Sequence, residues 1–96
     1  PNYINLMYNL ARYYYMCKDY NSSIKVCDKS LALSSANNDF KRIILFYYLK
    51  GLSMYQLKDP NYEKELNKSL DLCNLLLKDK LRILIEKSIK NIICTP

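Results

Sequence analysis

Between residues 8 and 38, apolar and small side chains recur at steps of three and four, on both sides of a polar break at positions 18–21. This spacing is typical of amphipathic helices, because residues three and four apart share one helix face. No segment alternates apolar and polar residues with a period of two, and turn residues recur too far apart for hairpins. The sequence therefore predicts an all-α fold, with two helices joined by a short turn in this stretch.

The same pattern extends along the chain and predicts about five antiparallel helices. Their expected ranges are 2–17, 20 to about 34, 39–57, 62–77 and 80–93. Asn38 or Asp39 can cap the third helix, and Pro60 disfavours helical geometry at Asp59, where that helix has to end. The third helix is apolar on nearly every face, so we expect it to lie at the centre.

Each of the other helices has an apolar stripe that we expect to face the core. In the first helix the stripe residues are Tyr3, Leu6, Met7, Leu10, Ala11, Tyr14 and Cys17, and in the second they are Tyr20, Ser23, Ile24, Cys27, Ser30 and Leu31. In the fourth helix they are Leu66, Leu70, Cys73 and Leu77, and in the fifth Leu81, Leu84, Ile85, Ile89 and Ile92.

The chain of 96 residues is half apolar and has one Gly and three Pro, which predicts a single compact domain over residues 1–96. A core of this size is thin, so we expect the chain to be a fragment of a longer protein that begins before Pro1. The longest apolar run, Ile43 to Leu49, is far shorter than the roughly 20 residues that span a membrane. We expect a soluble protein with no membrane partner.

The residues needed for common enzyme chemistry are missing. The chain has no His and no Gly-rich phosphate loop, which removes the usual general base and the usual nucleophile pairs. Cys17, Cys27, Cys73 and Cys94 form no CxxC pair, and a zinc site would need all four to converge. We therefore expect no enzyme activity, no cofactor and no metal, and reduced thiols in the cytoplasm.

Residues 4–37 resemble one 34-residue tetratricopeptide repeat when aligned without gaps. The positions that carry the resemblance are Leu10, Ala11, Tyr14, Tyr20, Ser23, Cys27 and Ser30. In such a unit Ala11 and Ser23 let the two helices approach closely, and Tyr14 and Tyr20 fill the space beside them. A weaker second copy covers about 40–77, where Gly51 repeats the small position 40 residues after Ala11 and Tyr62 serves as the turn aromatic. Residues 80–93 would then form a capping helix.

The segments YNLARYYYMCKDYNSSIKVCDKSL and FYYLKGLSMY are also similar to the C-terminal repeat regions of Rgg/PlcR-like helix-turn-helix transcription regulators. This resemblance implies the ligand-sensing and dimerising part of a cytoplasmic regulator, which binds DNA only through a domain absent from this chain. The alternative is a general protein–protein interaction scaffold or adaptor of the tetratricopeptide type.

The resemblance to tetratricopeptide arrays also implies a peptide-binding groove lined by the first helix of each pair. The groove positions would include Asn5, Tyr8, Asn9, Arg12 and Tyr15, together with Tyr48 from the second pair. We expect Asn5, Asn9 and Arg12 to contact a peptide backbone, with the three tyrosines as flat walls. The same residues also fit a solvated surface and ordinary packing between helices.

The net charge of +6 is spread over every segment, which favours a solvated surface over a DNA-binding face. A clamp for acidic peptide ends would need Lys or Arg where the chain has Asn5 and Asn9. Ile83 and Ile93 lie off the stripe of the last helix and predict a second apolar strip there. A homodimer contact and the loss of a neighbouring repeat explain this strip equally well.

Overall fold

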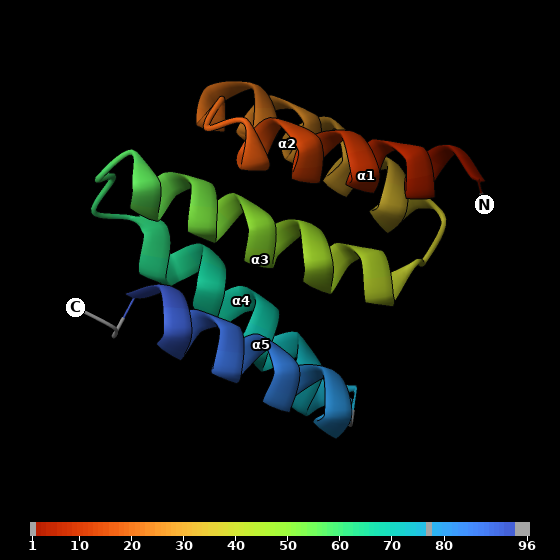
Figure 1. The fold of residues 1–96 in the computed structure, drawn as a ribbon. Helices are drawn as coiled ribbons and strands as arrows, with labels where there is room; N and C mark the ends of the chain where they lie inside the picture. The colour runs from red at the N-terminus through yellow and green to blue at the C-terminus, as the bar shows by residue number, and fades with distance from the viewer. Residues whose placement is uncertain (1, 77, 94–96) are drawn as a thin grey trace.

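The computed structural model describes residues 2–76 and 78–93 (Figure 1). Over these residues the chain forms five helices and no strand, which confirms the predicted all-α class. The helices are α1 (Asn2–Met16), α2 (Tyr20–Ala36), α3 (Phe40–Gln56), α4 (Tyr62–Leu75) and α5 (Asp79–Ile93). The predicted positions of Leu77 and Cys94 lie outside the described residues.

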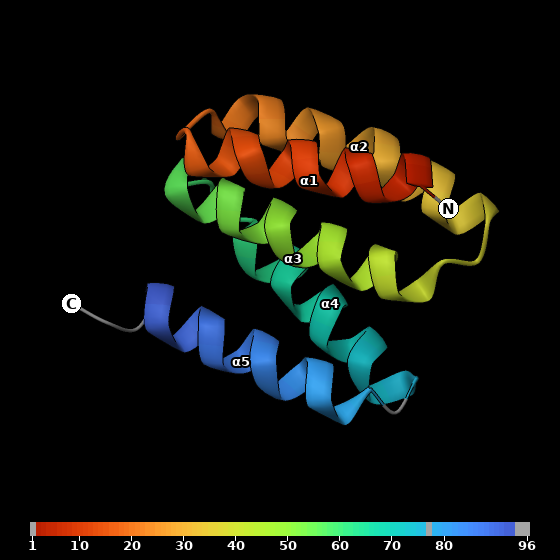
Figure 2. The same ribbon diagram turned by 45° about the vertical axis from the view of Figure 1, so that its right-hand side comes forward.

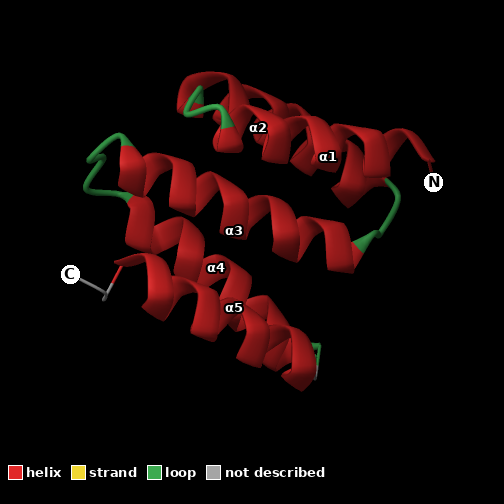
Figure 3. Ribbon diagram, viewed as in Figure 1, coloured by secondary structure: helices red, strands yellow, loops and turns green. Residues whose placement is uncertain are grey.

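The helices are arranged in two layers. α1, α3 and α5 run in one direction, while α2 and α4 run back in the other (Figures 1 and 2). The connections from α1 through to α4 are short (Figure 3). α3 contacts α1, α2 and α4, and its Tyr48 shares a hydrogen bond with Ser88 of α5, so the predicted central position of this helix is confirmed. Among the described residues, none of the helices combines the length and the apolar character needed to cross a membrane.

The first three helices end in the same way, at intervals of 20 residues. Lys18, Asn38 and Lys58 have left-handed backbone conformations, with φ of 63°, 54° and 60°. The residue after each donates its N–H to a carbonyl five positions back, at 2.9 Å: Asp19 to Tyr14, Asp39 to Ser34 and Asp59 to Met54. This pattern satisfies carbonyl groups that a helix leaves unpaired at its C-terminus.

Two of these aspartates also start the next helix. The Asp19 carboxylate accepts a hydrogen bond from the backbone N–H of Ser22, and that of Asp39 accepts one from Arg42, each at 3.3 Å. Both are N-caps, so one left-handed residue followed by Asp ends one helix and begins the next. The structure assigns the cap of α3 to Asp39.

Small residues bring the helices of each pair close together, as predicted. Ala11 and Ser23 are fully buried, and the Ser23 hydroxyl donates a 2.9 Å hydrogen bond to the Ala11 carbonyl. At the corresponding place in the second pair, a Cβ added to Gly51 would lie 2.6 Å from Cδ2 of Leu66. A larger residue at position 51 would therefore force Leu66 or the α3–α4 contact to shift.

An aromatic pair lies beside the turn within each helix pair. Tyr15 meets Tyr20 edge to face with ring centroids 5.4 Å apart, and Tyr55 meets Tyr62 in the same way at 5.1 Å. The prediction of Tyr20 and Tyr62 as turn aromatics agrees with this geometry. Tyr14, predicted to fill space beside Ala11, is half-buried, and it is the adjacent Tyr15 that meets Tyr20.

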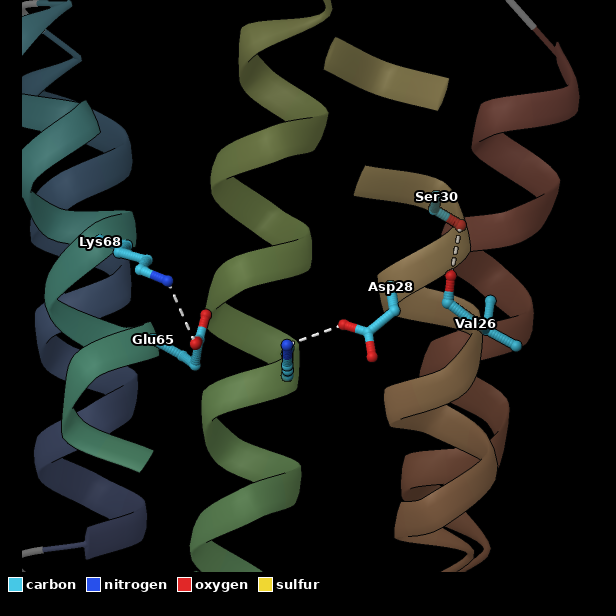
Figure 4. Close-up of polar contacts among 6 residues, drawn as sticks. Val26, Asp28, Ser30, Glu65 and Lys68 are labelled. Carbon is cyan, nitrogen blue, oxygen red and sulfur yellow. Dashed lines mark hydrogen bonds and ion pairs between the residues drawn. The ribbon is translucent and has the colours of Figure 1, made fainter. Parts of the chain in front are cut away.

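Lys50 connects the charges of α2, α3 and α4. It forms a 2.7 Å ion pair with Asp28 of α2, while Glu65 of α4 has its own partner within that helix, Lys68, at 3.3 Å (Figure 4). Burial acts to lower the pKa of Lys50, but its hydrogen bond to Asp28 and the charges of Asp28 and Glu65 outweigh that effect and raise the pKa. Lys50 is therefore charged at neutral pH and electrostatically links three helices.

The predicted core stripes are correct for α2 and α4 but partly wrong for α1 and α5. Ser23, Cys27 and Ser30 are buried in α2, as are Leu66 and Cys73 in α4.

In α1 the buried residues are Ile4 and Ala11, whereas predicted core members of that stripe are exposed: Tyr3, Leu6, Leu10 and Cys17. The apolar face that α1 turns to its neighbours is a different one from the longest apolar stripe. In α5, Ile85 is buried but Leu84 is exposed, because α5 contacts the rest of the molecule over a narrow strip. Ile83 is exposed, as predicted.

Candidate peptide-binding groove

A hollow of about 250 Å³ lies between α1, α3 and α5, on the layer that these three helices form. Four of the predicted site residues line it. Its full lining is Tyr8, Arg12, Tyr15, Met16, Tyr48, Leu49, Leu52 and Ile92. We refer to it as the α1–α3–α5 hollow.

The floor and the walls of the hollow come from different helices. Leu49 and Leu52 of α3 are buried and form an apolar floor. Tyr8 and Tyr15 lie two turns apart on one face of α1 and form one wall, and Ile92 of α5 stands opposite. The hollow therefore exists only where the first, third and fifth helices meet.

Burial keeps the phenol groups of the α1 wall neutral. The Tyr8 ring meets Phe46 edge to face at 5.8 Å, and burial raises the pKa of Tyr8, with the Arg12 cation partly offsetting this rise. Burial also raises the pKa of Tyr15, whose hydroxyl accepts a 3.2 Å hydrogen bond from Gln56. Near neutral pH both hydroxyls keep their protons and can donate hydrogen bonds.

Arg12 is the one charged residue among those that line the hollow. The ion pairs found among residues 2–76 and 78–93 involve Lys50, Lys68 and Arg82, and Arg12 has no carboxylate partner in this part of the chain. α1 itself contains no acidic residue. The guanidinium therefore presents its N–H donors to whatever occupies the hollow.

Two predicted site residues do not line the hollow. The Asn5 side-chain oxygen accepts hydrogen bonds from Arg42, from Nε at 2.7 Å and also from Nη2, so it joins α1 to α3. Asn9 is exposed on the outer side of α1. The structure brings together Tyr8, Arg12, Tyr15 and Tyr48, without the two asparagines.

The sequence pattern did not predict that α5 contributes a wall to the hollow. Ile92 was expected on the inward face of the last helix, with no link to the groove residues. It reaches the hollow because the hydrogen bond between Tyr48 and Ser88 holds α5 beside α3. Local spacing carries no signal for a contact between residues so distant in the chain.

The size of the hollow limits what it can hold. Pockets for drug-sized ligands have volumes of roughly 300–1,000 Å³. At about 250 Å³ the hollow suits a single apolar side chain better than a whole small molecule. Arg12 and the phenol groups at its rim can bind the polar groups next to such a side chain.

A larger hollow, of about 450 Å³, lies between the starts of α3 and α5. It is lined by Lys41, Lys78, Asp79, Lys80 and Leu81. Its charged side chains are exposed to water, so it has no buried floor comparable to that of the α1–α3–α5 hollow. Nor does any group of three Cys, Asp or Glu side chains in the described ranges come close enough to hold a metal ion.

Comparisons with known protein families, with curated proteins and with solved structures find no match to this chain.

Proposed function

We propose that this chain is a helical-repeat binding module that holds a short peptide segment in the α1–α3–α5 hollow. One observation carries the proposal. Tyr8, Arg12 and Tyr15 surround a buried apolar floor, and Arg12 has no carboxylate partner among the described residues.

The occupant would place one apolar side chain on Leu49 and Leu52. Burying such a side chain contributes roughly 1.5–3 kcal/mol. A backbone carbonyl or a carboxylate of the peptide would accept hydrogen bonds from Arg12, worth about 1.5–3 kcal/mol because the donor is charged. Ordering the peptide opposes both gains, so we expect micromolar affinity.

In the wider proposal, the module is the ligand-sensing and dimerising part of a cytoplasmic transcription regulator, and DNA is bound by a domain outside this chain. This context rests on the resemblance to Rgg/PlcR-like regulators. The alternative is a general protein–protein interaction scaffold, in which the hollow receives a loop of a folded partner. A helix-turn-helix domain encoded before Pro1 would support the regulator, and further repeats there would support the scaffold.

The groove can be tested with a displayed library of random heptapeptides, followed by fluorescence anisotropy with the selected peptides. Met16→Glu places a carboxylate at the rim and Arg12→Met removes the charge while keeping the stem. Met16 and Arg12 are exposed, so both variants should fold. We expect each variant to weaken binding at least tenfold.

The matched control is Lys29→Met, which removes one charge from an exposed position of α2. It should bind the selected peptides as the parent chain does. If no peptide is selected, or if Met16→Glu binds as well as Lys29→Met, the α1–α3–α5 hollow is not the peptide site.

A further inference from the structure

The hollow of about 450 Å³ between the starts of α3 and α5 gathers lysines from two distant parts of the chain. Lys41 lies in the first turn of α3, while Lys78 and Lys80 stand on either side of Asp79, the first residue of α5. The two helices begin at the same end of the molecule (Figures 1 and 2). We call this space, which Leu81 also lines, the lysine hollow.

The positive charge of the lysine hollow is not neutralised within the fold. None of its three lysines has a carboxylate partner in residues 2–76 and 78–93. Asp79, the one acidic residue of the lining, has Arg82 Nη2 at 3.8 Å from its carboxylate, and the nearby Asp39 carboxylate accepts the backbone N–H of Arg42. Three lysines and one aspartate leave the lining with a net formal charge of +2.

The kind of cation indicates the kind of anion that the lysine hollow suits. Concave surfaces lined by charges of one sign concentrate ions of the opposite sign. Lysine is a compact point charge that binds phosphate well, whereas planar carboxylates are matched best by the fork of arginine. The lining contains lysines and no arginine, so it favours a phosphate-bearing ligand with two or more negative charges.

The rest of the lining limits what such a ligand can carry into the hollow. It contains no aromatic ring on which a nucleobase could stack, and Leu81 is its one apolar residue. A single phosphate ion would leave most of the 450 Å³ empty, whereas a short chain of phosphates fills more of it and meets more than one lysine. The hollow is therefore suited to the phosphates themselves.

We propose that the lysine hollow binds a di- or triphosphate group, with its oxygens between Lys41, Lys78 and Lys80. The positive end of the α5 dipole adds to the attraction, and the Asp79 carboxylate opposes it. The lysines are exposed, so water and salt screen them, and we expect a dissociation constant of about 0.1–1 mM at 100 mM salt. The group can belong to free inorganic polyphosphate or to the tail of a nucleotide.

Isothermal titration of the intact chain with sodium tripolyphosphate in 100 mM NaCl tests this proposal. Lys41→Met and Lys80→Met should each weaken binding at least threefold, and the double variant at least tenfold. Asp79→Asn should strengthen binding two- to fivefold, because it removes the one negative charge of the lining. All three positions are exposed, and circular dichroism will verify that the variants are folded.

Two variants that make the same charge changes elsewhere are the matched controls. Lys25→Met on α2 and Asp71→Asn on α4 alter exposed residues outside the lysine hollow. Both should bind tripolyphosphate as the parent chain does. No binding by the parent chain up to 5 mM, or equal effects of Lys25→Met and Lys41→Met, would overturn the proposal, since the second result would show attraction to the net charge alone.

Titration with ATP and with adenosine distinguishes the two sources of the phosphate group. ATP should bind within about threefold of tripolyphosphate and adenosine should not bind, because the hollow offers nothing to the base. In ¹⁵N-labelled chain, the amide signals of Lys41, Lys80 and Leu81 should shift most on addition of tripolyphosphate. Binding of adenosine, or larger shifts in α2 than at these positions, would contradict a phosphate site in the lysine hollow.

Discussion

Cys27 and Cys17 are both free thiols, yet their surroundings make them chemically different. Cys27 is fully buried beneath α1 and α3, and burial raises its pKa from 9.0 to about 12. Cys17 is exposed at the end of α1. In the folded chain the Cys27 thiol therefore keeps its proton at pH values where an unfolded chain has lost it.

This difference predicts a loss of stability in alkali. Below pH 9 the Cys27 thiol is protonated in both states and has no effect on the pH dependence. Between pH 9 and about 12 the unfolded chain binds fewer protons than the folded one, so the free energy of unfolding falls as the pH rises. At pH 11 the loss due to Cys27 should be about 2–3 kcal/mol.

Urea unfolding at pH 8 to 11 measures this effect. The parent chain and Cys17→Ala should lose stability together, while Cys27→Ala should lose about 2–3 kcal/mol less over the same range. Tyr8 and Tyr15 also have raised pKa values, chiefly through burial, and that part is common to all three proteins. The Cys27 charge adds to the raised pKa of Tyr8, and the hydrogen bond to Cys17 raises the pKa of Tyr13, so each variant also removes one of these smaller effects. Parallel pH profiles for Cys27→Ala and Cys17→Ala would contradict the assignment.

Glycine should be favoured at the left-handed turn residues Lys18 and Lys58. A lysine at positive φ carries a steric cost of roughly 1–2 kcal/mol that glycine does not. Lys18→Gly and Lys58→Gly should therefore raise the free energy of unfolding, by about 0.5–1 kcal/mol. Asn38→Gly should gain less, because Asn tolerates this conformation, and Lys18→Asn separates the backbone effect from the loss of charge. Equal changes in Lys25→Gly, within α2, would rule out a turn-specific cause.

At the scale of a helix pair, Gly51 sets the distance between α3 and α4. In an ordinary helix Gly→Ala is stabilising by about 1 kcal/mol. Here the new Cβ would lie 2.6 and 2.7 Å from two side-chain carbons of Leu66 and 3.1 Å from its backbone nitrogen. We expect Gly51→Ala to destabilise the chain by about 1–3 kcal/mol.

A double-mutant cycle makes that prediction specific. In a Leu66→Ala background the two crowded side-chain carbons are gone, so Gly51→Ala should become neutral or stabilising there. Thermal or urea unfolding of the four chains gives the coupling. A cost for Gly51→Ala that persists in the Leu66→Ala background would show that Leu66 is not the cause.

The elements themselves could be predicted from the sequence, because three- and four-residue steps and the Asp39 cap are local signals. The face that a helix buries was harder to predict. α1 has two apolar faces, one with Ile4 and Ala11 and one with Leu6 and Leu10, and periodicity alone cannot tell which of them meets a neighbour. The lining of the α1–α3–α5 hollow could be predicted in part, because Tyr8, Arg12 and Tyr15 follow one face of one helix, whereas the place of Ile92 depends on how α5 is packed.

Over the whole molecule, α5 is the least firmly held helix. Ile85 is its one buried residue within 79–93, and a hydrogen bond between Ser88 and Tyr48 joins it to α3. Helices with little burial open locally before the rest of a fold. Because Ile92 forms one wall of the α1–α3–α5 hollow, the shape of the hollow depends on this weakly held helix.

Hydrogen exchange followed by mass spectrometry tests this difference. Amides of α5 should exchange at least tenfold faster than those of α3. Tyr48→Phe should speed exchange in α5 by a further two- to tenfold, as expected for one lost hydrogen bond, and leave α1 and α2 unchanged. Tyr47→Phe, at the neighbouring position, is the control. Equal protection of α3 and α5, or an equal effect of the two variants, would contradict this description.

Because the turns at Lys18, Asn38 and Lys58 have the same backbone conformation, a chain of this kind could lengthen by duplication of the segment between them. A segment of 40 residues cut between the first and third turns begins and ends in the same backbone conformation, with an aspartate at each junction. A duplicated copy could therefore be inserted there without altering either junction. Duplication of this segment would add one helix to each layer, and chains built this way could differ in length while keeping the same turn at every junction.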